Sequence, residues 1–272
     1  MTNSQLEGFR RPLAYREEAF LQSPESRPLR ILSEYLWPLV HFQEERIQDT
    51  IVFFGSARIE EAGPLGRYYR EARELARLVT EWAMSISKPE SCAEPRRRFV
   101  VCSGGGPGIM EAANRGASEA GGKTIGLNIG LPFEQRPNPF ITPELCFEFQ
   151  YFFMRKFWFA YLAKALVVFP GGFGTLDELM EILTLAQTRK LEGKILIVLY
   201  GSEFWNEILN FEALVKHDVI SKEDMNLFRF VDSPGAALQI LKEDLTRYYL
   251  EPESTLQRPL EETPDIARTR TS

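Results

Sequence analysis

Short apolar runs alternate with longer amphipathic segments over most of the chain. Strands are expected where the apolar runs are short and continuous. A strand and its turn are expected over 50–58, and two further strands should begin at residues 99 and 166. The other strands are expected over 123–129, 145–149, 194–201 and 228–231. Helices are expected between the strands, over 64–87, 152–165 and 202–216. One more helix should end near residue 122, one should begin after residue 175, and the last should end at about residue 249. Continuous apolar strands that alternate with helices predict an open, doubly wound, Rossmann-like α/β fold. Its sheet should be mainly parallel, with helices on both faces.

The two ends of the chain differ in composition from this alternating region. Residues 1–48 are rich in Arg, Glu and Pro but contain apolar patches, which predicts an N-terminal extension of one or two short helices packed on the domain. Residues 251–272 contain few large apolar side chains, which predicts a disordered tail. The Rossmann-like domain is therefore expected to span 49–250.

Composition and charge narrow the range of partners. The 272 residues are 44% hydrophobic, enough for one α/β domain with a sizeable core. The formal net charge is −6, and the basic run at 96–98 is short, so no nucleic-acid or membrane surface is expected. The polar N-terminus and the absence of an apolar run of about 20 residues predict a cytoplasmic protein.

The cysteines and histidines offer little for metal or thiol chemistry. Cys92, Cys102 and Cys146 lack metal or redox spacing, and Cys102 lies in an apolar run that predicts a buried thiol. A reducing compartment is therefore expected. The chain contains 2 histidines, His41 and His217, far apart in sequence, so no metal site is predicted.

Three unusual turns follow predicted strands. They are Gly55–Arg58, Ser103–Gly108 and Pro170–Thr175. Ligands of doubly wound sheets bind beyond the carboxyl ends of the strands, and helix starts there offer unpaired N–H groups to anions. Each turn alone is also explained as a plain connection, but the three together favour a phosphate-bearing ligand. Neither the G-x-G-x-x-G nor the G-x-x-x-x-G-K-[ST] pattern occurs, which disfavours a dinucleotide cofactor and an ATPase loop.

A cationic pair lies in the aromatic helix predicted over 152–165. Arg155 and Lys156 are flanked on a helical net by Phe, Trp and Tyr side chains. Burying two cations is costly without anionic partners, so Arg155 is expected to face a ligand phosphate or a carboxylate of the site. The alternative is that both side chains extend from an interface helix to water.

The helix after Pro170–Thr175 is apolar on two sides and also carries acids. Asp177, Glu181, Thr184 and Thr188 form a polar strip, whereas Glu178 stands apart in what is expected to be the first turn. An acid in a first turn is often only a complement to the helix dipole. The two apolar sides are explained by a homodimer interface or by thicker packing within one chain.

These motifs resemble one family. The stretches "SGGGPGIMEAANRGA", "MRKF" and "PGGFGTLDE" are similar to those of the LOG family, the cytokinin riboside 5′-monophosphate phosphoribohydrolases once labelled lysine decarboxylases. The pattern P-G-G-x-G-T-x-x-E is met in full, and the resemblance covers roughly residues 50–248. Asp177 in place of the plant Glu and the N-terminal extension suggest a longer, bacterial-type member.

The resemblance implies an N-glycosidase that releases free base and ribose 5-phosphate from a nucleoside 5′-monophosphate. Its catalytic pair would be Arg155 and Glu178. The residues expected to bind substrate are Ser56, Gly104, Gly105, Gly106, Gly108, Glu134, Lys156, Gly171, Gly172, Phe173, Gly174, Thr175, Leu176, Asp177 and Thr184. No metal and no cofactor are implied, and no pyridoxal phosphate site is recognisable.

Several alternatives stay open at this level. The base could be a cytokinin or a plain purine, as in AMP. A molybdenum cofactor carrier, which resembles this superfamily, would bind a phosphorylated pterin without hydrolysing it. A nucleotide-sensing scaffold without activity is a third reading, against which the retained Arg155 and Glu178 argue. A homodimer or higher homo-oligomer is expected.

Overall fold

The fold is built on one sheet whose strands all run parallel. In a computed structural model, residues 12–87, 96–130, 136–191 and 193–251 are described. The sheet has seven strands in the order β4-β3-β2-β1-β5-β6-β7. The strands are β1 (Thr50–Phe54), β2 (Val100–Ser103), β3 (Thr124–Ile129), β4 (Cys146–Phe149), β5 (Ala163–Val168), β6 (Leu196–Tyr200) and β7 (Phe228–Val231). This arrangement confirms the predicted doubly wound, Rossmann-like fold.

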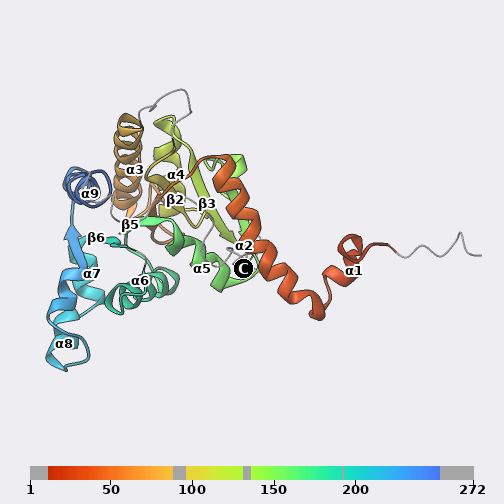
Figure 1. Cartoon of the computed structure of the whole chain (residues 1–272). Coiled ribbons are helices and arrows are strands. Elements are labelled where there is room, and N and C mark those ends of the chain that lie inside the picture. The colour runs from red at the N-terminus through yellow and green to blue at the C-terminus, as the bar shows by residue number, and fades with distance from the viewer. Residues whose placement is uncertain (1–11, 88–95, 131–135, 192, 252–272) are drawn as a thin grey trace, which may run out of the picture.

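Helices cover both faces of the sheet, as Figure 1 shows. One face is covered by α3 (Gly66–Ile86), α4 (Ile109–Glu119) and α9 (Pro234–Tyr249). The other face is covered by α2 (Arg27–Glu44), α5 (Phe152–Tyr161), α6 (Phe173–Gln187), α7 (Ser202–Ile208) and α8 (Phe211–Lys216). Short helical turns complete the chain: α1 (Glu18–Leu21), η2 (Ala14–Arg16), η3 (Pro24–Ser26), η4 (Pro143–Leu145) and η5 (Glu223–Leu227).

The central strand β1 shows why the sheet is covered twice. All five of its residues are buried. Ile51 and Phe53 pack with α3, α4 and α9, whereas Val52 and Phe54 pack with α5 and α6. Side chains of a strand alternate between its two faces, so a strand that is apolar at every position requires two covering layers. The continuous apolar runs of the sequence are explained by this double burial.

The strand order changes direction between β1 and β5, and this positions the candidate site. From β1 the chain proceeds through β2, β3 and β4 on one side, and then through β5, β6 and β7 on the other. The connections after β1 and β5 therefore leave the sheet in opposite directions, and ligands of doubly wound sheets bind beyond the carboxyl ends of the strands at such a point. The predicted turns Gly55–Arg58 and Pro170–Thr175 follow these two strands, and Ser103–Gly108 follows the neighbouring β2.

Two predicted element boundaries are wrong. The helix expected over 152–165 ends at Tyr161, and β5 begins at Ala163. The β5 residues are almost all buried, and pairing with β1 and β6 outweighs the helical pattern that continues through Ala165. The helix expected over 202–216 is broken because Leu209 is extended, and the Asn210 side chain accepts from the N–H of Ala213 to cap α8.

The N-terminal segment packs on the domain through α2, a helix of 18 residues rather than the short helices that were expected. Tyr35 and Phe42 contact Trp158 of α5, with ring centroids 5.7 and 5.2 Å apart. Another side of α2 is exposed and apolar, with Leu29, Leu32, Leu36, Trp37 and Val40. In Figure 1 the first half of α2 extends away from the sheet toward α1. The predicted tail lies, apart from Glu251, outside the described residues.

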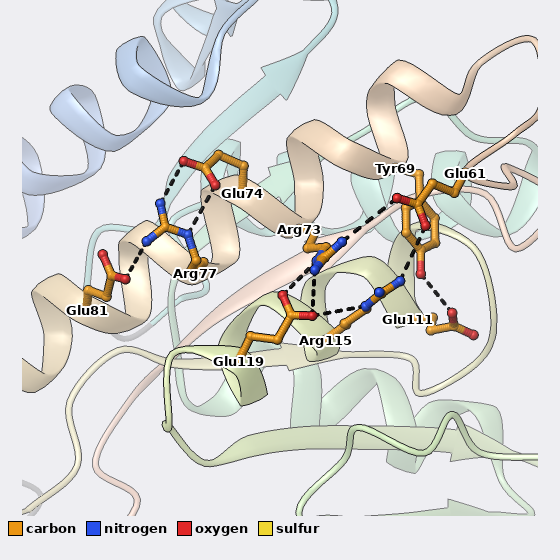
Figure 2. A network of polar contacts seen from close by, with 9 residues as sticks. All are labelled: Glu61, Tyr69, Arg73, Glu74, Arg77, Glu81, Glu111, Arg115 and Glu119. Carbon is orange, nitrogen blue, oxygen red and sulfur yellow. Dashed lines mark hydrogen bonds and ion pairs between the residues drawn. The ribbon is translucent and has the colours of Figure 1, made fainter.

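A polar network joins α3 to α4 across their exposed sides (Figure 2). Arg73 donates two hydrogen bonds of 2.7 Å to Glu119, which also accepts from Arg115. Tyr69 donates to Glu111 in the first turn of α4. Exposed ion pairs contribute little each, but a network with bidentate geometry fixes the relative position of two helices. It therefore steadies α4, whose start forms part of the turn after β2.

None of the helices in the described ranges is long and apolar enough to cross a membrane.

One buried ion pair lies at the opposite, amino-terminal end of the sheet. Asp49 precedes β1, is 1% exposed, and pairs with Arg98 at 2.6 Å. Its other carboxylate oxygen accepts from the N–H of Phe99, which has a positive φ of 53°. Asp49 therefore joins the entry of β1 to the entry of β2.

The Asp49→Ala substitution should destabilise the fold by about 3–5 kcal/mol, because it leaves the largely buried Arg98 guanidinium without its carboxylate. Urea unfolding followed by circular dichroism measures the change. The control is Glu74→Ala, which removes an exposed partner of Arg77 and should cost at most about 1 kcal/mol. Equal costs for the two variants would contradict the assignment.

Candidate functional site

The three predicted turns lie side by side and are joined through the backbone of Ser56. The N–H of Ser56 donates to the Pro170 carbonyl at 3.0 Å, and the Ser56 carbonyl accepts from the N–H of Ile109 at 3.1 Å. A Cβ on Gly108 would lie 2.3 Å from that Ser56 carbonyl, and Gly108 has a φ of 70°, so this position requires glycine. The turns therefore form one connected surface, as the sequence predicts for a common ligand.

Arg155 lies against the turn that follows β2. A Cβ on Gly104 would lie 2.6 Å from Nη2 of Arg155 and 2.7 Å from the sulfur of Met110. Glycine at this position thus leaves the space that the guanidinium occupies. The glycine turn and the aromatic helix, which are far apart in the sequence, meet at this contact.

The Arg155 guanidinium is mostly buried without a complete set of protein partners. Its Nε is buried and makes no hydrogen bond, and no ion pair with Arg155 occurs in the described ranges. The Phe159 ring lies 5.2 Å below the guanidinium carbon. Burial lowers the pKa of Arg155, and the nearby Glu178 opposes this effect. A buried cation with an unused donor is suited to bind an anion.

Glu178 is the buried carboxylate of the site, with 7% of its surface exposed. Burial raises the pKa of Glu178 to about 7, although Lys156 and Arg155 favour its ionised form. Because α6 begins at Phe173, Glu178 lies in the second turn, so the expectation of a first-turn acid is wrong. The helix dipole acts mainly within the first turn, which leaves dipole stabilisation as a weak explanation for Glu178.

Lys156 points to the polar strip of α6. Its Nζ lies 2.8 Å from Asp177 and 2.7 Å from Glu181, which places a lysine between two carboxylates next to Glu178. These acids raise the pKa of Lys156 against the opposing effect of burial. Thr184 is exposed and donates its hydroxyl to the Met180 carbonyl, so it belongs to the same strip, away from the glycine turns.

The turn after β5 combines a folded inner part with an open outer part. Thr175 is buried, and its hydroxyl would lie 2.1 Å from a Cβ on Gly171. By contrast, a Cβ on Gly172 or Gly174 would meet no atom of the described residues within 4 Å. Phe173 between them is 93% exposed. The first N–H groups of α6 have no intrahelical acceptors, so they can donate to a ligand that approaches this open side.

Leu176 is half-buried and packs with the core cluster under α5 and α6 rather than on the open side. Gly105, with a φ of 73°, lies against the Asn128 side chain, and Gly106 is buried beside it. Glu134, the predicted acid after the third strand, lies outside the described residues. Its role therefore stays a prediction.

Sequence reasoning missed a buried polar network behind the turn after β2. Ser103 donates to Oδ1 of Asn114 at 2.6 Å, and Nδ2 of Asn138 donates to the same atom at 2.9 Å. Asn114 also donates to Thr124 at the start of β3. Asn114 lies within the motif "GIMEAANRGA", but Asn138 stands between two prolines in a loop, where no periodic pattern marks it.

Metal and thiol chemistry receive no support from the described residues. No group of three or more His, Cys, Asp or Glu side chains there could hold a metal ion. Cys102 is buried, as its apolar run predicts, and burial raises the pKa of its thiol.

The Glu178→Gln variant should gain stability relative to wild type as the pH rises. The fold favours the protonated acid, so the stability that Glu178 contributes is present below its unfolded pKa and is lost as the pH rises through about 7. Between pH 5 and 8 the difference in unfolding free energy should change by up to about 3 kcal/mol. Chemical denaturation at several pH values measures it.

Glu203→Gln serves as the control, because Glu203 is an exposed acid at the start of α7, the helix that follows β6. It should show no comparable rise in relative stability. A difference between Glu178→Gln and wild type that stays constant over this range would contradict the buried, destabilised carboxylate.

Comparisons with known proteins agree with these motifs. A family model described as "possible lysine decarboxylase" matches residues 110–241. The probable cytokinin riboside 5′-monophosphate phosphoribohydrolase LOGL3 of Oryza sativa subsp. japonica is 27% identical over 214 residues, which are 76% of this chain and 87% of that protein. The cytokinin riboside 5′-monophosphate phosphoribohydrolase LOG of the same plant is 27% identical over 203 residues, 74% of each chain.

One solved structure shares the fold. An X-ray structure of TM1055, a structural genomics target, aligns with a TM-score of 0.50 and 20% identity over 72% of this chain and 99% of that one. At this identity the match concerns the fold alone. Together with the family model and the plant relatives, the motifs at Ser103–Gly108, Arg155 and Pro170–Glu178 show that this chain is similar to the LOG family.

Proposed function

We propose that this protein hydrolyses the N-glycosidic bond of a nucleoside 5′-monophosphate, with water as co-substrate and free base and ribose 5-phosphate as products. The observation that carries the proposal is the buried Glu178, near Arg155 and Lys156, at the sheet edge where the glycine turns meet. Relatives named as phosphoribohydrolases support this reaction class. A homodimer or higher homo-oligomer in the cytoplasm is part of the proposal.

The charge of the transition state explains a carboxylate at this position. As the bond from ribose to base breaks, positive charge develops on the sugar, and the bond's electron pair leaves with the base. An ionised Glu178 in a poorly hydrated site stabilises that charge strongly. Water then adds to the anomeric carbon, and its proton balances the charge of the departing base.

The phosphate of the substrate would occupy the open side of the turn after β5. The N–H groups of Gly172, Gly174 and Thr175 would donate to it, helped by the turn after β2. Arg155 would bind phosphate or ribose oxygens with its unused donors and orient Glu178. Anion and carboxylate would then lie at different ends of one ligand, so they need not repel each other.

Two identities of the base are compatible with this site, a cytokinin and a plain purine such as that of AMP. The plant relatives are named for cytokinin ribosides, but at 27% identity that specificity is a proposal for this chain. A carrier of a phosphorylated pterin is the competing function. Purification with a bound pterin, together with no base release from any nucleotide, would favour the carrier.

The Glu178→Gln variant should release base from AMP or isopentenyladenosine monophosphate at least about a hundredfold more slowly than wild type, because it lacks the stabilising charge. Base release is measured by chromatography. For wild type, kcat/KM should rise with pH up to about 7, since the ionised acid is needed. Glu203→Gln, which alters an exposed acid of α7, should retain wild-type rates. A fully active Glu178→Gln would refute the assignment.

Wild type should strongly prefer AMP to adenosine, by roughly ten- to a hundredfold in kcat/KM, because charged hydrogen bonds hold the phosphate. Gly172→Ala should reduce this preference, since its methyl group would enter the space proposed for phosphate without touching the described protein. Gly235→Ala also meets no described atom within 4 Å and lies in the first turn of α9, so it is the matched control. Equal turnover of AMP and adenosine by wild type would refute the phosphate anchor.

A further inference from the structure

The Asn138 side chain donates hydrogen bonds to backbone carbonyl oxygens of the turn after β2. The side chain is 6% exposed, and its Nδ2 lies 3.0 Å from the Gly105 carbonyl and 3.2 Å from the Gly106 carbonyl. The backbone N–H of Asn138 also donates to the Gly105 carbonyl, at 2.8 Å. With Oδ1 of Asn114 as a further acceptor, three oxygen atoms surround Nδ2, which fixes the orientation of the amide.

These hydrogen bonds to the Gly105 carbonyl determine the direction of the N–H of Gly106. In a trans peptide the carbonyl and the following N–H point in opposite directions. Because the Gly105 carbonyl faces Asn138, the N–H of Gly106 faces away from it. Gly106 is buried, yet within the described part of the chain its N–H donates to no acceptor. Within the described residues the N–H of Gly106 is therefore free to donate to a ligand that approaches from the side opposite Asn138.

The support behind Asn138 is rigid and specific. Asn114, itself fully buried, accepts from Asn138 and from Ser103 and donates to Thr124 and to the carbonyl of Ile125 in β3. The Ser103 hydroxyl in turn accepts from the N–H of Gly105. A fully satisfied buried network of this kind admits one arrangement. The segment around Asn138 is thereby attached to the glycine turn that follows β2.

We propose that Asn138 is a positioning residue that orients the N–H of Gly106 as a donor to the phosphate of the ligand, next to the Arg155 guanidinium at Gly104. The inference rests on the proposed function in that the ligand is a nucleoside monophosphate. It extends the site to a loop residue that no motif includes. Asn138 itself does not touch the substrate.

Calorimetric titration with AMP and with adenosine tests the inference without requiring turnover. Asn138→Ala should weaken AMP binding by roughly ten- to a hundredfold and leave adenosine binding unchanged, since one charge-assisted hydrogen bond is lost. The control is Asn210→Ala, which removes the cap of α8 and should lower stability without changing the ratio of the two affinities. A folded Asn138→Ala protein with the wild-type ratio would overturn the inference.

A second measurement needs no variant and covers the case in which Asn138→Ala does not fold. In the amide spectrum of wild type, the Gly106 signal should shift strongly with AMP or inorganic phosphate and little with adenosine. An unperturbed Gly106 signal in the presence of bound AMP would overturn the inference. Failure of the proposed function has a different signature, namely AMP binding with a shifted Gly106 signal but no release of base.

Discussion

The candidate site depends on keeping Glu178 and Arg155 near each other in a poorly hydrated space, without a direct ion pair between the two in the described residues. Glu178 is buried, and its pKa of about 7 shows that the fold disfavours its charge. Arg155 is also largely buried, with an unused Nε, and Lys156 is shared between Asp177 and Glu181. Because no ion pair joins Glu178 and Arg155 in the described ranges, both groups stay available for the proposed substrate. The fold thus sacrifices some stability where chemistry is proposed.

The rest of the fold accounts for this arrangement. The reversal of strand order at β1 and β5 places the turns after these strands at one edge of the sheet, and the backbone of Ser56 joins the turns to each other. Glycine at 104 leaves room for Arg155, and glycine at 108 allows contact with Ser56. The polar network between α3 and α4 in Figure 2 fixes the position of α4, which begins directly after the turn Ser103–Gly108. These features position the backbone of the turns, and they contribute few side-chain functional groups to the candidate site.

The sequence predicts the fold class and the three turns well because both follow from strong local patterns. Buried strands of a parallel sheet are apolar at every position, and glycine-rich turns can be recognised directly in the amino-acid sequence. It predicts less well what tertiary contacts decide. β5 begins at Ala163 because sheet pairing outweighs helix propensity, and Glu178 lies in the second turn because α6 begins at Phe173.

Long-range polar contacts are harder still to predict. Asn138 reaches Gly105 across 33 positions, and nothing in its local sequence indicates an amide directed at two carbonyl groups. The polar residues of the network behind the turn lie on a strand end, a helix, a strand start and a loop. Only the folded sheet brings these together. Motif-based reasoning finds the groups that are proposed to meet a ligand, whereas the group that is proposed to orient them is found only in the structure.

The N-terminal helix α2 has a structural connection to the site, through the start of α5. The Glu34 carboxylate accepts from the N–H groups of Gln150 and Tyr151, at 2.8 and 3.2 Å, immediately before that helix begins. The Glu34 carbonyl accepts from the Trp158 indole. A carboxylate at a helix start satisfies otherwise free N–H groups and complements the dipole. Since α5 carries Arg155 and Lys156, a segment outside the Rossmann-like sheet fixes the helix that supplies both cations of the site.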